Sequence, residues 1–157
     1  MISDKNSDLP VVEIFCDGAC KGNPGPGGWG TLLRSDGKEK ELSGYESNTT
    51  NNRMELKACL NGLKSLTKPC RIKITTDSQY LAKAFNNGWL AKWQKNGWRT
   101  ADKSPVKNKE LWEELVAETS KHQVEWLWIK GHAGHSENER CDKLAVEACK
   151  AGIEKER

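Results

Sequence analysis

The sequence lacks any long hydrophobic run. Among its 157 residues, no apolar stretch approaches the roughly 18 residues that a membrane-spanning helix needs. The first ten residues, MISDKNSDLP, contain no apolar core of the kind found in a secretion signal. We therefore predict a cytoplasmic protein with no membrane partner, in which residues 1–10 form a loose tail.

The cysteine patterns of metal-binding modules are also missing. The chain has six cysteines and three histidines, yet no C-x-x-C pair occurs and the histidines complete no zinc-binding spacing. Because no secretion signal precedes them, we expect the cysteines to be free thiols in a reducing compartment. A structural zinc site is therefore not predicted.

Charge is small in total but unevenly distributed. The formal net charge is +3, while residues 86–109 alone hold six basic residues and one acidic residue. The rest of the chain is therefore slightly acidic, and the basic segment predicts a polyanionic partner. Tryptophans alternate with the basic residues of this segment. They are also typical of an aromatic patch that packs a protruding helix onto the body of a protein.

The length and the apolar patterning predict one α/β domain over residues 11–152, followed by a short tail at 153–157. Strands are expected at residues 11–17, 29–34, 38–45, 71–76 and 123–129, and helices at about 50–66, 78–85, 89–95, 111–121 and from 137. The first three strands form an antiparallel meander. Strands separated by helices pair in parallel, so we expect a five-stranded mixed sheet, with residues 22–28 as a glycine- and proline-rich turn.

Four acidic residues occupy informative places in this pattern. Asp17 and Asp77 end two strands that we expect to be parallel neighbours, where sites form in open α/β sheets. Glu55 shares a helix flank with small residues, which allows close approach to the sheet, and Asp142 lies in the second turn of the last helix. Taken singly, the first three also fit ordinary roles as a turn cap, a helix N-cap and a solvated first-turn glutamate.

Several carboxylates that converge would repel one another strongly. A hard divalent cation relieves this repulsion, and Mg²⁺ prefers a few carboxylates together with water and phosphate oxygens. A two-metal site of this kind activates a water molecule and stabilises the leaving oxygen of a phosphodiester. His132 lies in a glycine-rich loop, from which a histidine can move a proton.

Five motifs occur in order along the chain: FCDGACKGNPGPGG at residues 15–28, TTNNRMEL at 49–56, TDSQY at 76–80, GWRTADK at 97–103 and KGHAGHSENERCD at 130–142. Together they resemble bacterial type 1 ribonuclease H over residues 11–152. The resemblance implies a ribonuclease H-like fold with helices on both faces of the sheet. It also implies an endonuclease that uses Mg²⁺ or Mn²⁺, with two ions when substrate is bound.

The implied activity is hydrolysis of the RNA strand of RNA–DNA hybrids, leaving 5′-phosphate and 3′-hydroxyl ends. Nothing in the sequence demands more than a monomer, and we expect no obligatory protein partner. By position in the motifs, Asp17, Glu55, Asp77 and Asp142 match the metal-binding catalytic acids. His132 matches a catalytic histidine that assists proton transfer and product release.

Further positions match substrate contacts of the family. A first set touches the hybrid, including its 2′-hydroxyl groups: Cys20, Asn23, Asn51, Asn52 and Gln79. A second set belongs to a basic protrusion at about residues 86–107 that grips the DNA strand: Trp89, Lys92, Trp93, Lys95, Trp98, Arg99, Lys103 and Lys107. The chain departs from the family where Arg99 and Ser104 replace expected lysines and where a residue near Asn87 is inserted.

Two alternatives remain open at this point. A non-catalytic hybrid-binding module would keep the fold and the basic segment but would lose at least one acid, whereas all four are present. A related nuclease of the same fold would cut DNA instead. A nucleotide-binding loop is disfavoured, because such a loop leads into a helix and this one leads into an expected strand.

Overall fold

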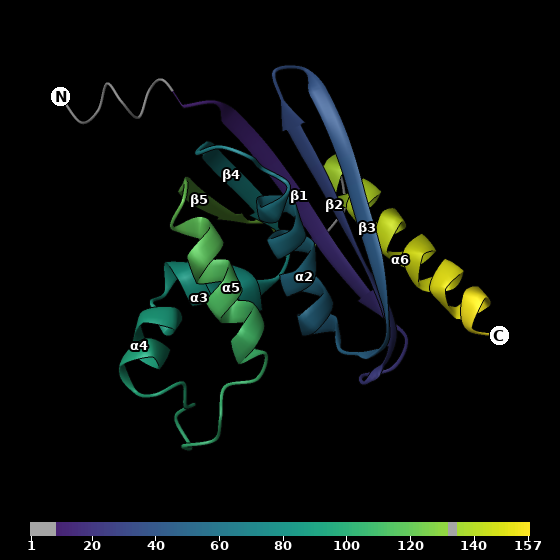
Figure 1. The fold of residues 1–157 in the computed structure, drawn as a ribbon. Helices are drawn as coiled ribbons and strands as arrows, with labels where there is room; N and C mark the ends of the chain where they lie inside the picture. The colour runs from purple at the N-terminus through teal and green to yellow at the C-terminus, as the bar shows by residue number, and fades with distance from the viewer. Residues whose placement is uncertain (1–8, 132–134) are drawn as a thin grey trace.

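A computed structural model describes residues 9–131 and 135–157, and it contains a mixed sheet with helices on both faces (Figure 1). The strands are β1 (Val11–Cys20), β2 (Gly25–Ser35), β3 (Lys38–Thr49), β4 (Arg71–Thr76) and β5 (Gln123–Trp128), in the order β3-β2-β1-β4-β5. β3, β2 and β1 are antiparallel neighbours, whereas β4 and β5 run parallel to β1. The predicted mixed sheet is confirmed.

The helices divide between the two faces of the sheet. They are α2 (Asn51–Lys64), α3 (Gln79–Asn86), α4 (Trp89–Lys95), α5 (Lys109–Thr119) and α6 (Ser136–Glu156). Figure 1 shows α6 on one face and α2, α3 and α5 on the other, with α4 and the loop after it standing away from the sheet. None of the helices in the described part of the chain is both long and apolar enough to cross a membrane.

The glycine- and proline-rich segment differs from its prediction. A strand was expected only from Trp29, but β2 begins at Gly25 and continues the pairing with β1. The physical reason is helix packing, because α6 crosses this part of the sheet. A Cβ atom on Gly28 would lie 2.2 Å from the carbonyl oxygen of Ala145, and one on Gly30 would lie 2.4 Å from that of Cys141. Glycines that weaken an isolated strand are therefore required here.

Small residues on α2 likewise allow this helix to approach the opposite face of the sheet closely. A Cβ atom on Gly62 would lie 2.9 Å from the methyl carbon of Thr31, and the Thr31 hydroxyl donates to the carbonyl of Ala58 at 2.6 Å. Thr50 caps the helix by accepting a hydrogen bond from the amide of Arg53 at 3.2 Å. The predicted close approach of this helix to the sheet is confirmed.

The start of α6 also differs in detail from expectation. The helix was expected to begin at residue 137, but its N-cap residue is His135, and the side chain of His135 makes no capping hydrogen bond. The Ser136 hydroxyl instead donates to Glu137 at 3.2 Å, and Glu137 accepts from Arg34 at 3.0 Å. A tertiary ion pair to β2 therefore anchors this helix end in place of a local cap.

A histidine ahead of β5 makes the stability depend on pH. Nδ1 of His122 accepts a hydrogen bond from the amide of Cys70 at 3.0 Å, and burial lowers the pKa of this imidazole. The unfolded chain therefore takes up this proton more readily than the folded chain as pH falls below about 6.5. The free energy of unfolding consequently decreases as pH falls from about 6.5 toward the lowered pKa.

We predict that His122→Asn reduces this pH dependence, because the asparagine oxygen can accept the same hydrogen bond without titrating. The measurement is the free energy of unfolding in urea at several values between pH 5 and pH 7. His122→Ala, which removes the acceptor, should cost about 1 kcal/mol at pH 7. Equal pH slopes in the wild type and His122→Asn would contradict the assignment.

Candidate active site

The site begins where β1 and β4 end side by side. Phe15 pairs with Thr75 in the parallel register, so two residues further on Asp17 lies beside Asp77. Both side chains occupy the same face by the alternation of a strand. Asp17 is 2% exposed, and Asp77 is half-buried. The neighbouring strand ends that the sequence predicts therefore place these two carboxylates together.

Glu55, on α2, can lie near Asp17 because Gly18 lets this helix approach β1 closely. A Cβ atom on Gly18 would lie 2.7 Å from that of Met54 and 2.8 Å from the amide nitrogen of Glu55. Any other residue at this position would push the first turn of α2 away from β1. The amide of Gly18 also donates to Oδ1 of Asp17 at 2.9 Å. One glycine thus allows the third carboxylate to approach and helps to orient the first.

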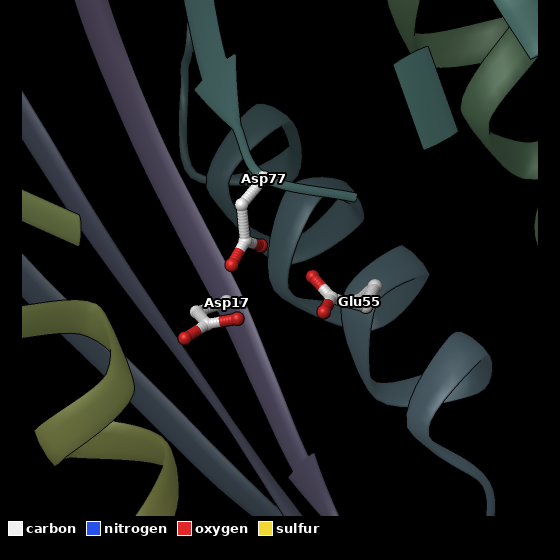
Figure 2. Close-up of side chains that lie close together, drawn as sticks. All are labelled: Asp17, Glu55 and Asp77. Atoms are coloured by element: carbon white, nitrogen blue, oxygen red, sulfur yellow. The ribbon is translucent and has the colours of Figure 1, made fainter. Parts of the chain in front are cut away.

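Figure 2 shows the three carboxyl groups turned toward one another from β1, α2 and the end of β4. Asp17, Glu55 and Asp77 each offer an oxygen, and these oxygens lie within 4.8 Å of one another. Burial raises the pKa of Glu55 well above its usual value, and the charge of Asp17 raises it further. The folded chain therefore holds negative charge here at a considerable electrostatic cost.

This cluster fits a hard divalent cation. Oε2 of Glu55 is buried and accepts no hydrogen bond within the described residues, so a ligand position for a cation is available there. Carboxylate oxygens are the donors that Mg²⁺ and similar ions prefer, and a bound ion would offset the repulsion. The three acids can therefore hold a metal ion.

Two buried thiols lie behind the carboxylates. Cys16 precedes Asp17 on β1, and Cys59 follows Glu55 by one turn of α2; both are fully buried and free. A hydrogen bond with Cys59, followed by burial, raises the pKa of Cys16 well above its usual value. Protonated thiols are poor metal ligands, so the donor set at this site remains one of oxygen atoms.

The remaining predicted acid lies apart from this cluster. Asp142 is half-buried on α6 and does not belong to the group of carboxylates within 4.8 Å. Its neighbour Cys141 fixes the helix to β1, because the Cys141 thiol donates to the carbonyl of Phe15 at 3.2 Å. The structure thus brings three of the four predicted acids together. His132 lies outside the described residues.

The five residues predicted to contact the hybrid do not all line the same cavity. Asn23, Asn51 and Asn52 line a cavity of about 480 Å³ together with residues of the loop after α4. The amide of Asn51 donates to the side chain of Asn23 at 3.2 Å, and the thiol of Cys20 donates to the carbonyl of Thr49 at 3.4 Å. Gln79 does not line this cavity; it lines a separate and smaller one beside α3.

In the predicted protrusion, the tryptophans pack against other rings and the basic side chains are exposed. The ring of Trp93 lies 5.6 Å from that of the buried Trp112, and the rings of Trp89 and Trp98 lie 6.1 and 6.3 Å from Trp93. The tryptophans therefore pack this segment against the body of the protein. The predicted basic side chains are all exposed: Lys92, Lys95, Arg99, Lys103 and Lys107. Lys107 also lines the cavity of Asn51.

Three features of the site were missed by the sequence analysis. Gly18 carries no motif signal beyond its place after Asp17. Ser78, rather than Asp77, caps α3, because its hydroxyl accepts from the amide of Leu81 at 3.1 Å. The indole of Trp128 donates to the carbonyl of Asp77 at 3.0 Å. Only its position at the end of β5 could have indicated this contact.

Comparison with known proteins gives a consistent result. The family model described as RNase H matches residues 10–150. Ribonuclease H of Bradyrhizobium diazoefficiens is 60% identical over 139 residues, which cover 88% of this chain and 90% of the relative. Ribonuclease H of Thermoanaerobacter sp. is 54% identical over 145 residues, which cover 92% and 94%.

Solved structures share the architecture. LC9-RNase H1, a type 1 RNase H with the type 2 active-site motif, matches with a TM-score of 0.82 and 33% identity, covering 91% of this chain and 74% of that one. LC11-RNase H1, solved in complex with an RNA/DNA hybrid, has a TM-score of 0.68 at 21% identity, covering 90% and 99%, and so shares the fold. Because the family model spans most of the sequence and the curated relatives align over nearly their whole length, this chain belongs to the RNase H family.

Proposed function

We propose that this chain is an endonuclease that hydrolyses the RNA strand of RNA–DNA hybrids and leaves 5′-phosphate and 3′-hydroxyl ends. The observation that carries the proposal is the convergence of Asp17, Glu55 and Asp77 within 4.8 Å, in a chain of the RNase H family. The enzyme acts as a cytoplasmic monomer through one domain at residues 11–152.

The acids have the role of metal ligands in this proposal. Asp17, Glu55 and Asp77, joined by Asp142 from α6, hold Mg²⁺ or Mn²⁺, with two ions when substrate is bound. Ions held by these residues would supply Lewis-acid chemistry, which would activate a water molecule and stabilise charge on the leaving oxygen. The protein orients these carboxylates before substrate binds; the hydrogen bond from the amide of Gly18, for example, orients the carboxylate of Asp17.

The other residues bind and orient the substrate. Cys20, Asn23, Asn51, Asn52 and Gln79 contact the hybrid around its 2′-hydroxyl groups, which distinguish RNA from DNA. The basic side chains of the protrusion hold phosphates of the DNA strand, and its tryptophans keep the segment in place. His132 transfers a proton and assists the release of product.

The test is cleavage of one RNA–DNA hybrid with a labelled RNA strand, beside matched RNA and DNA duplexes, each with Mg²⁺ or with a chelator. Metal-dependent cleavage of only the hybrid RNA is expected. Binding without cleavage would favour a hybrid-binding module, and cleavage of the DNA duplex would favour a DNA nuclease of the same fold.

Glu55 should stabilise the metal site at a cost to the metal-free fold. Since its raised pKa means that the folded chain binds this proton more tightly, stability decreases as pH rises above the ordinary carboxyl pKa of about 4.3. We predict that Glu55→Gln raises the free energy of unfolding at pH 8 without metal by about 1 kcal/mol or more. Cleavage should be lost.

The measurement is urea unfolding with and without Mg²⁺, because an ion that binds only the folded state stabilises it. Added Mg²⁺ should stabilise the wild type and leave Glu55→Gln unchanged. Glu113→Gln, on the exposed side of α5, is the matched control and should behave as wild type. A Glu55→Gln variant that is less stable without metal would refute the electrostatic account.

The exposed lysines of the protrusion should set the salt dependence of binding. Each phosphate contact contributes about 0.7 to 0.9 to the slope of log affinity against log salt concentration. We predict that neutralising Lys92, Lys95 and Lys103 to glutamine weakens hybrid binding and reduces this slope by about 2 to 3. Binding is measured in an Asp17→Asn background, which prevents cleavage. Replacing Lys38, Lys40 and Lys73 is the control, and an equal slope in both triple variants would exclude the protrusion from binding.

A further inference from the structure

A second cavity lies on the other side of the first turn of α3. Its volume is about 210 Å³, and its lining residues are Gln79, Ala82, Lys83, Asn86, Asn87 and Trp128. Tyr80 lines the larger cavity described above, whereas its neighbour Gln79 lines this one. The two cavities therefore flank the beginning of α3, directly after Asp77.

Trp128 connects the small cavity to the acidic cluster. Its indole nitrogen donates to the carbonyl of Asp77 at 3.0 Å, yet the side chain remains 39% exposed. A large aromatic side chain that is held through its ring nitrogen and remains partly exposed can stack against a sugar or a base. The cavity wall is thus joined to the backbone of a proposed metal ligand.

The polar side chains of this cavity make no hydrogen bonds or ion pairs with the described part of the chain. Gln79, Lys83, Asn86 and Asn87 lie at helical spacing along one side of α3 and its C-cap, and all four are exposed. Within residues 9–131 and 135–157, none of their side chains makes a hydrogen bond or an ion pair. Their donors and acceptors are therefore available to a ligand.

The charge of the cavity is opposite to that of its neighbour. None of its six lining residues is acidic, and Lys83 adds a positive charge on α3, the helix that follows Asp77. A polyanionic strand that crosses the acidic cluster is repelled there, so a nearby cation offsets part of that cost. The ammonium group suits a phosphate, and the amides suit ribose hydroxyl groups or base edges.

We propose that this cavity is a subsite for one nucleotide of the RNA strand, next to the phosphate that is cleaved and on the opposite side from the Asn23 and Asn51 cavity. Lys83 binds its phosphate, Asn86 and Asn87 bind polar groups of the nucleotide, and Trp128 stacks on it. This assignment rests on the proposed function. The volume is smaller than the roughly 300 Å³ of pockets that enclose a whole ligand, which fits one unit of a strand lying across it.

The test uses Lys83→Gln, with Lys150→Gln on the exposed side of α6 as the matched control. Hybrids with a single cleavable site are shortened one nucleotide at a time from either end of the RNA strand. We expect Lys83→Gln to raise KM about five-fold with kcat unchanged, as long as the subsite is filled. The difference should disappear once shortening from one particular end empties the subsite, while shortening from the other end should leave it intact.

A second variant and a second readout make the outcome decisive. Asn86→Ala combined with Asn87→Ala should show the same dependence on length, and Lys83→Gln should reduce the salt slope of hybrid binding by about 0.7 to 0.9. Equal KM and equal salt slope in Lys83→Gln and Lys150→Gln on every hybrid would overturn the subsite. If the wild type cleaves no hybrid, the proposed function fails instead, and hybrid affinity of the same two lysine variants then decides whether the subsite exists.

Discussion

Mutual repulsion among three closely spaced carboxylates is the constraint on which the rest of the structure depends. Asp17, Glu55 and Asp77 would separate if the chain were free to move, so the fold must hold them within 4.8 Å. It does so with rigid parts: a parallel register places the two aspartates side by side, and Gly18 lets α2 contact β1. The repulsion would favour binding of a cation, because a cation among the carboxylates would relieve it.

The opposite face of the sheet shows how a helix can be held without a local cap. Arg34 pairs with Glu39 and Glu137, and Arg140 pairs with Glu39 and Glu41, so charges on β2, β3 and the first turns of α6 form one network. Single surface ion pairs contribute little, but a network that shares partners restrains several elements together. This network fixes the helix that carries Asp142.

In the protrusion, aromatic side chains pack against the protein and basic side chains face solvent. The ring of Trp93 packs on Trp112, and the basic side chains of the protrusion stay exposed. Around the start of α3, one cavity adjoins the protrusion and the other adjoins Trp128. A nucleic acid strand laid across the acids would meet polar and basic groups on both sides, an arrangement that suits a long polyanion better than a small ligand.

The sequence by itself determined the order of strands and helices and the parallel pairing, and it placed Asp17 and Asp77 at neighbouring strand ends, because hydrophobic periodicity and strand-end positions are local properties of the chain. It misplaced the start of β2, since the need for glycine at residues 28 and 30 arises from α6, which lies more than a hundred residues later. Only the tertiary structure decided that Glu55 lies within 4.8 Å of the two aspartates while Asp142 is outside that group, and that Trp128 contacts Asp77. These outcomes depend on distances between elements that are remote in the sequence, and such distances are set by packing rather than by local pattern.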